Sequence, residues 1–225
     1  NPKVKEAIDF AFNRIKKFHQ LQKVKSIKYT DTYKNKIDYR VVPIHSAGIY
    51  VPANLPSTLL MNAIPARICG VKRLVLANPR INGQLNPAVM YVAKKCNIKE
   101  IITVGGAQAI ASMAYIQKVN KIFGPGNDYV AKAKQIVFGD VGIEGMIAGP
   151  SEVTVVADDK TNIDQAVTSM AAQSEHGHNS QSILITKSKK FIKRFNSQIL
   201  FTVRNLSKKK NHRSKFQKKW INYFS

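Results

Sequence analysis

The sequence predicts an α/β protein with a Rossmann-like, mainly parallel sheet and flanking helices. Two observations lead to this fold class: short apolar runs alternate with helix-like stretches of about ten to fifteen residues, and glycine-rich turns join several of them. The chain has 225 residues, of which 44% are hydrophobic, which is enough for a sizeable core. No internal repeat of fixed period interrupts this alternation.

The expected elements follow this alternation along the chain. Helices are expected at 3–24, 57–70, 87–97, 107–115, 127–138 and 162–176. Strands are expected at 71–78, 100–106, 119–123, 153–159 and 181–186, with short extended segments over 39–53. The strands near 71–77, 101–104, 153–157 and 181–186 are expected to lie mainly parallel in one sheet.

The charge is large but unevenly placed. The net charge is +23, yet the central region is nearly neutral, and the residues after Glu175 include 13 Lys or Arg and no Asp or Glu. A nucleic-acid module concentrates its charge on a folded groove or helix face, so nucleic-acid binding is disfavoured here. No apolar run is long enough to span a membrane, and no secretory signal is recognisable. Cys69 and Cys96 lie in apolar stretches and are expected to be buried thiols of a cytoplasmic protein.

Three turns built from glycine and small polar residues lie at expected strand boundaries: VGGAQAIA at 104–111, FGPGNDYV at 123–130 and MIAGPSEVTV at 146–155. Ligands of open α/β sheets bind where strands end and helices begin. Each turn alone is also typical of an ordinary tight connection. Neither GxGxxG after a strand nor GxxxxGK[ST] occurs, so the usual nucleotide fingerprints are missing.

A fourth motif, AAQSEHGHNSQ at 171–181, carries possible metal ligands. Gln173 and His176 are three residues apart on an expected helix, so one Zn²⁺ could meet both. From residue types alone, a histidine near the helix C-terminal dipole is the favoured interpretation, because glutamine is a poor zinc ligand and one histidine does not make a site.

These motifs, together with IYVPANLPSTLLMNAIPARICGV and KIFGPGNDYVAKAKQIVFGDVGI, resemble the histidinol dehydrogenase family over about residues 1–190. The resemblance implies NAD-dependent oxidation of L-histidinol to L-histidine, the last step of histidine biosynthesis, in a zinc-containing cytoplasmic homodimer. It places NAD contacts on Tyr50, Gln108 and Asn127. It places substrate contacts on Ser151, Gln173 and His176, of which Gln173 and His176 are also zinc ligands.

The pattern along the chain predicts three parts: an N-terminal helix and connecting segment (1–46), a Rossmann-like region (47–187), and a basic tail that is poorly ordered or frame-shifted (188–225). The resemblance makes the middle part the NAD- and substrate-binding region. The family's catalytic Glu-His pair and its remaining zinc ligands have no counterparts here, since no carboxylate side chain follows Glu175. The chain therefore resembles a truncated member, inactive by itself. Two alternatives remain open: a dehydrogenase of a related polyol such as sulfopropanediol, or a non-catalytic remnant.

Overall fold

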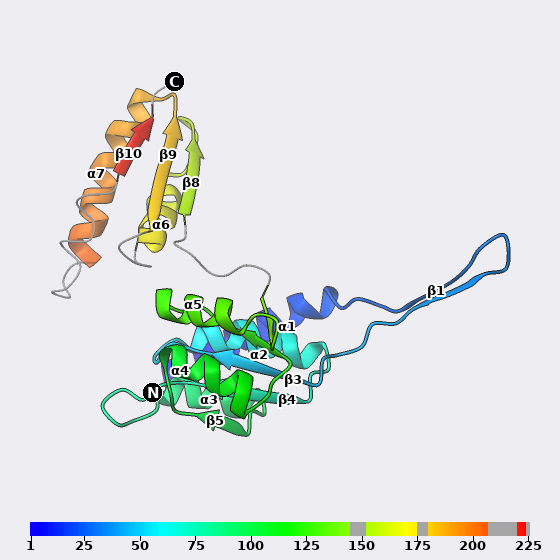
Figure 1. The fold of residues 1–225 in the computed structure, drawn as a ribbon. Helices are drawn as coiled ribbons and strands as arrows, with labels where there is room; N and C mark the ends of the chain where they lie inside the picture. Colours follow the sequence, from blue (N-terminus) through cyan, green and yellow to red (C-terminus); the bar gives the residue numbers. More distant parts are fainter. Residues whose placement is uncertain (145–151, 175–179, 207–219, 224–225) are drawn as a thin grey trace. The chain divides into compact units, whose positions relative to one another are not determined.

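The computed structural model describes residues 1–144, 152–174, 180–206 and 220–223. The chain divides into two compact units, Asn1–Ala148 and Gly149–Ser225. Within the described residues the first unit contains a five-stranded sheet and a separate two-stranded hairpin, and the second unit contains a three-stranded sheet (Figure 1).

The first unit alternates strands and helices. Its helices are α1 (Pro2–Leu21), α2 (Pro56–Ile68), α3 (Pro87–Lys95), α4 (Gly106–Ala111), the π-helical turn η1 (Ser112–Ile116) and α5 (Asp128–Val137). Its strands are β1 (Ile27–Thr30), β2 (Lys36–Tyr39), β3 (Ser46–Tyr50), β4 (Arg73–Ala77), β5 (Glu100–Ile102), β6 (Lys121–Phe123) and β7 (Gly142–Ile143). The expected α/β alternation is thereby confirmed, with boundaries shifted by a few residues.

The five-stranded sheet has the order β5-β4-β3-β6-β7, and every neighbouring pair is parallel. Of these strands, the central one, β3, comes first in the chain. The strands β4 and β5 are then added on one side of β3, and β6 and β7 are added on its other side. Numbered by their order along the chain, the strands run 3-2-1-4-5, which is the Rossmann order. The direction of winding reverses between β3 and β6, and such a reversal opens a crevice at the carboxyl ends of the strands.

The two faces of this sheet pack against different helices. Ala47, Ile49 and Leu74 face a core formed with α1, α2 and α3, whereas Val75 and Ile122 face a core formed with α4, η1 and α5. Alternate strand residues point to opposite faces, so the near-continuous apolar runs of β3 and β4 reflect a sheet covered on both sides.

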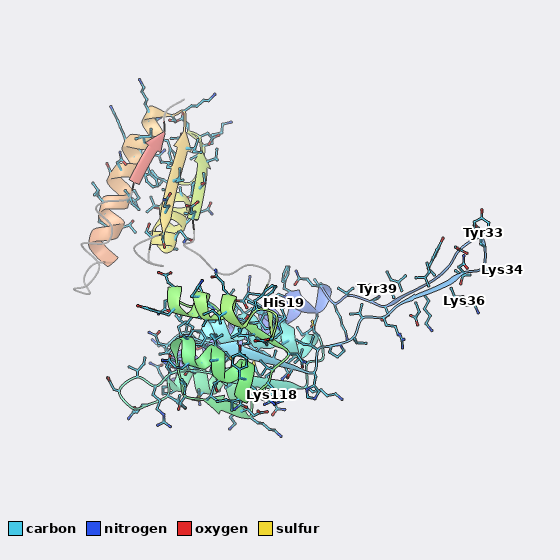
Figure 2. All side chains as sticks on the ribbon, in the orientation of Figure 1. His19, Tyr33, Lys34, Lys36, Tyr39 and Lys118 are labelled. Atoms are coloured by element: carbon cyan, nitrogen blue, oxygen red, sulfur yellow. The ribbon has the colours of Figure 1, made fainter. Side chains whose placement is uncertain are left out.

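The hairpin β1–β2 extends away from the sheet, and all of its strand residues are exposed. The register pairs Ile27 with Tyr39 and Tyr29 with Ile37, so one face of the ribbon is apolar. Figure 2 shows Tyr33, Lys34, Lys36 and Tyr39 along this arm. The sequence pattern predicts only short extended segments from residue 39 onwards, so most of the hairpin is an addition to the expected fold.

The second unit contains β8 (Glu152–Ala157), α6 (Ile163–Ser174), β9 (Gln181–Thr186), α7 (Lys189–Leu206) and β10 (Trp220–Tyr223). Its sheet has the order β10-β9-β8 and is parallel. The expectation of one sheet was wrong: β4 and β5 belong to one sheet, and β8 and β9 to another.

The stretch after residue 187 also differs from the expectation of no regular element. It contains α7, whose Phe191, Phe195 and Ile199 are buried against α6 and β9. The apolar spacing of these residues along one helix face accounts for the helix. Strand β10 then pairs with β9 beyond it.

Two further observations bear on the expectations from composition. Among the described residues, no helix is both long enough and apolar enough to cross a membrane. Both cysteines are free thiols; Cys96 is buried as expected, but Cys69 is exposed at the C-terminal end of α2, so that part of the prediction was wrong.

Candidate functional site

Polar and glycine residues gather where the strands of the five-stranded sheet end. Tyr50 is the last residue of β3, Asn78 follows β4 directly, and Gln108 stands in the first turn of α4 after β5. Asn127 closes the loop after β6, and Glu144 follows β7. Because all five strands are parallel, these positions share one edge of the sheet. Tyr50 and the loop before Asn127 flank the reversal between β3 and β6.

Tyr50 is fixed in the sheet rather than free in the crevice. Its side chain is nearly buried in the core beneath α4, and its hydroxyl accepts a hydrogen bond from the Gly106 N–H at 3.3 Å. Gly106 has a positive φ of 64°, and a side chain there would lie 3.1 Å from Oε1 of Gln108. The Gln108 carboxamide therefore curls back over the start of α4, on the same glycine that Tyr50 contacts. Two of the three predicted NAD contacts are thus brought together.

The GPGN loop, Gly124–Asn127, needs its two glycines because neighbouring atoms leave no room for a side chain at either position. At Gly124 φ is +117°, and a Cβ would lie 2.0 Å from the carbonyl oxygen of Tyr50. At Gly126 a Cβ would lie 2.2 Å from Cγ1 of Val130. The first glycine lets the loop press against the end of β3, and the second lets it turn over the first turn of α5. The loop after β6 is therefore in contact with Tyr50.

Asn127 is the N-cap of α5. Its side-chain oxygen accepts a hydrogen bond from the Val130 N–H at 3.1 Å, as capping residues do. The residue is exposed, so the NH₂ group of the same carboxamide can meet a ligand while the oxygen holds the cap. Capping and ligand contact are compatible at this position.

Two buried polar residues beside these loops, Asn78 and Lys134, were not among the predicted site residues. Asn78 is fully buried; its Nδ2 donates to the Val51 carbonyl at 3.1 Å, and its main-chain N–H donates to the Ile102 carbonyl at 3.0 Å. It ties together the ends of three strands. Lys134, in the middle of α5, is 2% exposed and bonds to the Gly124 carbonyl and Glu144. An Asn directly after an apolar strand could have been predicted as a site residue from the sequence. The burial of a lysine in AKAKQIV could not.

The predicted substrate and zinc residues belong to the second unit. Ser151 and His176 lie outside the described residues, so their predicted roles remain predictions. Gln173 lies in the last turn of α6, and its Nε2 is buried without a hydrogen-bond partner in the described part of the chain. Because a carboxamide can turn either its nitrogen or its oxygen to a given point, this buried end is suited to a ligand.

The strand expected after the AGPSE motif is confirmed as β8, which begins at Glu152. Gln173, the described member of the second unit's candidate residues, lies near the C-terminal end of α6, and β9 follows it in the chain.

The described residues fit the two expected cofactors unequally. The first unit offers glycine backbones that no side chain could replace and exposed carboxamides at a switch point, which fits a dinucleotide. For zinc, no group of three His, Cys, Asp or Glu side chains occurs among the described residues, and Gln173 is the one predicted ligand that lies there. The first unit is thus a Rossmann-like α/β unit with its polar groups at the switch point.

Comparisons with known proteins identify the family. The histidinol dehydrogenase family model matches residues 1–223. Histidinol dehydrogenase of Pelagibacter ubique is 56% identical over 211 residues, covering 91% of this chain and 49% of that protein. The crystal structure of histidinol dehydrogenase from Elizabethkingia anophelis superposes with a TM-score of 0.86 at 38% identity, covering 91% of this chain and 49% of that one. The chain belongs to the histidinol dehydrogenase family.

The same fold extends to more distant enzymes. Succinate-semialdehyde dehydrogenase from Burkholderia pseudomallei matches with a TM-score of 0.58 at 12% identity, covering 87% of this chain and 42% of that one. At that identity the likeness concerns the fold alone. The chain spans about half the length of the curated relatives it matches.

Proposed function

We propose that this chain supplies the NAD-binding half, and part of the zinc and substrate site, of a cytoplasmic, homodimeric histidinol dehydrogenase. That enzyme would oxidise L-histidinol to L-histidine and reduce two NAD⁺ in succession. The observation that carries the proposal is the placement of Tyr50, Gln108 and Asn127 beside the winding reversal of a Rossmann-ordered sheet, in a chain of this family.

Each of the three residues has a distinct part in holding the cofactor. When bound, NAD⁺ supplies the acceptor for the hydride that leaves the substrate carbon. Tyr50 is held by the Gly106 N–H and gives the crevice a rigid wall between β3 and α4. Gln108 and Asn127 are exposed and offer amide groups to the polar parts of the dinucleotide. Residues fixed by the scaffold bind with less loss of side-chain freedom.

Gln173, His176 and Ser151 would contact the substrate, the first two also as zinc ligands. A zinc ion there would serve as a template that grips the amino and imidazole nitrogens of histidinol. Within the described residues the buried amide nitrogen of Gln173 has no hydrogen-bond partner, and a flip of the carboxamide would turn its oxygen to a metal at the same point, which supports this role. Zinc sites are commonly four-coordinate, and the chain offers two ligands of the family set.

The 225-residue chain by itself would neither hold zinc tightly nor oxidise histidinol. Each oxidation step must remove a proton as the hydride leaves, and a positioned general base contributes roughly 10²–10⁴-fold. The family's Glu-His pair has no counterpart, since Glu175 is the last carboxylate side chain in the sequence. A second copy of the same chain would lack the same groups.

Cofactor binding is tested on the chain by calorimetric titration with NAD⁺. Gln108→Ala and Asn127→Ala should each raise the dissociation constant about tenfold, the effect of one lost hydrogen bond of about 1.4 kcal/mol. Gln135→Ala is the matched control, because Gln135 is exposed on α5 away from the loop. Unchanged affinity in both site variants would count against the assignment.

Turnover is tested separately. The purified chain is mixed with Zn²⁺, NAD⁺ and histidinol, and NADH absorbance is followed. We expect no steady rate. Sustained turnover that a chelator abolishes would mean that residues 1–225 contain a complete active site, contrary to the proposal.

A further inference from the structure

A buried charge lies directly behind the GPGN loop. Lys134 belongs to α5, and 98% of its side chain is withdrawn from solvent. Its ammonium group forms an ion pair with Oε1 of Glu144 and donates a hydrogen bond to the carbonyl oxygen of Gly124. The other carboxylate oxygen of Glu144 is buried and has no partner in the described part of the chain.

Stability alone does not explain such a pair. Removing an ammonium and a carboxylate from water costs several kcal/mol each, and apolar residues of similar size are often as stable or more so. The buried neighbours of Lys134 along α5 are apolar: Val130, Ala133 and Val137 belong to the core beneath the helix. A methionine would fit this setting without the desolvation cost. The buried charge of Lys134 is therefore better explained by the segments that its ammonium group holds in place.

The ammonium group joins three segments at the carboxyl edge of the sheet. Gly124 directly follows β6, and Glu144 directly follows β7, its parallel neighbour. Lys134 reaches both from α5, ten residues along the chain from each. Gly124 in turn presses on the main chain of Tyr50, the end of β3. A continuous series of contacts thus runs from Glu144 through Lys134 and Gly124 to Tyr50.

We propose that Lys134 is a positioning residue for the cofactor, which anchors the GPGN loop by its first carbonyl and so sets where Asn127 stands. Glu144 holds the lysine in the required direction. The inference rests on the proposed binding of NAD⁺ at this edge. Lys134 is buried behind the loop, so it acts on the cofactor through Gly124 and Asn127.

The test needs a variant that removes the anchor without leaving a buried charge unpaired. Lys134→Met alone would leave the Glu144 carboxylate buried without its partner. The decisive variant is therefore Lys134→Met combined with Glu144→Gln. Lys132→Met is the matched control, because it removes the same charge from an exposed position of α5. Three quantities are measured on each: the thermal midpoint, the dissociation constant for NAD⁺, and the exchange rate of the Val130 amide.

The Val130 amide reports the loop directly, because it donates to the side chain of Asn127. The Val51 amide, bonded to the Ala77 carbonyl at 2.9 Å, serves as a reference for the sheet. In the double variant we expect a thermal midpoint within a few degrees of wild type and unchanged Val51 exchange. Loss of the anchoring hydrogen bond should speed Val130 exchange about tenfold and weaken NAD⁺ binding about tenfold. Lys132→Met should change none of these.

If the double variant has the same Val130 exchange rate and the same NAD⁺ affinity as wild type, the proposal is overturned and the ion pair has only a structural role. If the wild-type chain itself fails to bind NAD⁺, the proposed function is what fails. In that case the Val130 rate still decides whether Lys134 anchors the loop. Faster Val51 exchange in parallel with Val130 would show general loosening of the sheet and would also overturn it.

Discussion

Replacing Gly124 by alanine should disable the crevice between β3 and β6. The added Cβ would lie 2.0 Å from the Tyr50 carbonyl oxygen, and real Cβ atoms essentially never approach a neighbour closer than 3.0 Å. The loop and the end of β3 must therefore move apart by at least 1.0 Å, the difference between these two distances. The Cβ is attached rigidly to the main chain and its neighbour is a main-chain oxygen, so no rotation of a side chain relieves the overlap.

The expected loss of stability has two parts. An alanine held at the positive φ of Gly124 costs about 1–3 kcal/mol. Separating the loop from β3 also strains the hydrogen bond that Lys134 donates to Gly124, which adds about 1–3 kcal/mol for a buried polar group left without a partner. Together the free energy of unfolding of the first unit should fall by about 2–6 kcal/mol.

Gly139 provides the control, because it has a similar φ of +108° and nothing within 4 Å of the position of a Cβ. In Gly139→Ala the free energy of unfolding should fall only by the cost of holding an alanine at a positive φ. Native-state hydrogen exchange of the Val51 amide measures both variants within the first unit. A difference of about 2 kcal/mol corresponds to about thirtyfold faster exchange in Gly124→Ala than in Gly139→Ala. Equal rates would refute the argument that the Tyr50 contact dictates this glycine.

Three further predictions follow from the packing. Cys69 should react with iodoacetamide at pH 8, as followed by mass spectrometry, whereas Cys96 should stay unmodified until the chain unfolds, because burial raises the pKa of its thiol to about 11. Hydrogen bonds from Lys95 and Tyr91 lower the pKa of Asp9 below 3.8, so the stabilisation is present above pH 3.8 and disappears as the pH falls through the lowered value. The thermal midpoint of Asp9→Asn should therefore lie below that of wild type at pH 7, and the gap should close as the pH falls through the lowered pKa of Asp9; a gap of constant size across this acid range would contradict the ion-pair explanation. Phe191→Ala, at a fully buried position of α7, should cost about 3–5 kcal/mol and unfold the second unit first in urea, with no effect on Val51 exchange.

The sequence predicted those elements whose patterns are local. The spacing of Val4, Ile8 and Phe12 suffices for α1, and the apolar run before Asn78 suffices for β4. The Gly-rich turns marked the edge at which Tyr50, Gln108 and Asn127 lie, because glycine is required wherever main chains approach closely.

The remainder depended on contacts between distant segments. Nothing in AKAKQIV distinguishes the buried Lys134 from the exposed Lys132, since the distinction comes from Glu144 and from a carbonyl ten residues earlier. Assignment of β8 and β9 to their own sheet is likewise a matter of pairing. Helix α7 is a different case: Phe191, Phe195 and Ile199 carry a readable helical period, which its many lysines and lack of acidic residues obscured.

The position of β3 at the centre of the sheet has a consequence for the order in which the protein is made. Ser46 and Asn120, 74 residues apart, exchange hydrogen bonds at the amino ends of β3 and β6. During synthesis, Tyr50, α2, β4 and α3 leave the ribosome well before β6 does. A nascent chain that ends before Lys121 can therefore assemble one wall of the crevice but not the other. In the proposed function the dinucleotide would be met only by chains that have completed the return to β3, so cofactor binding would stabilise that step of folding and none of the earlier ones.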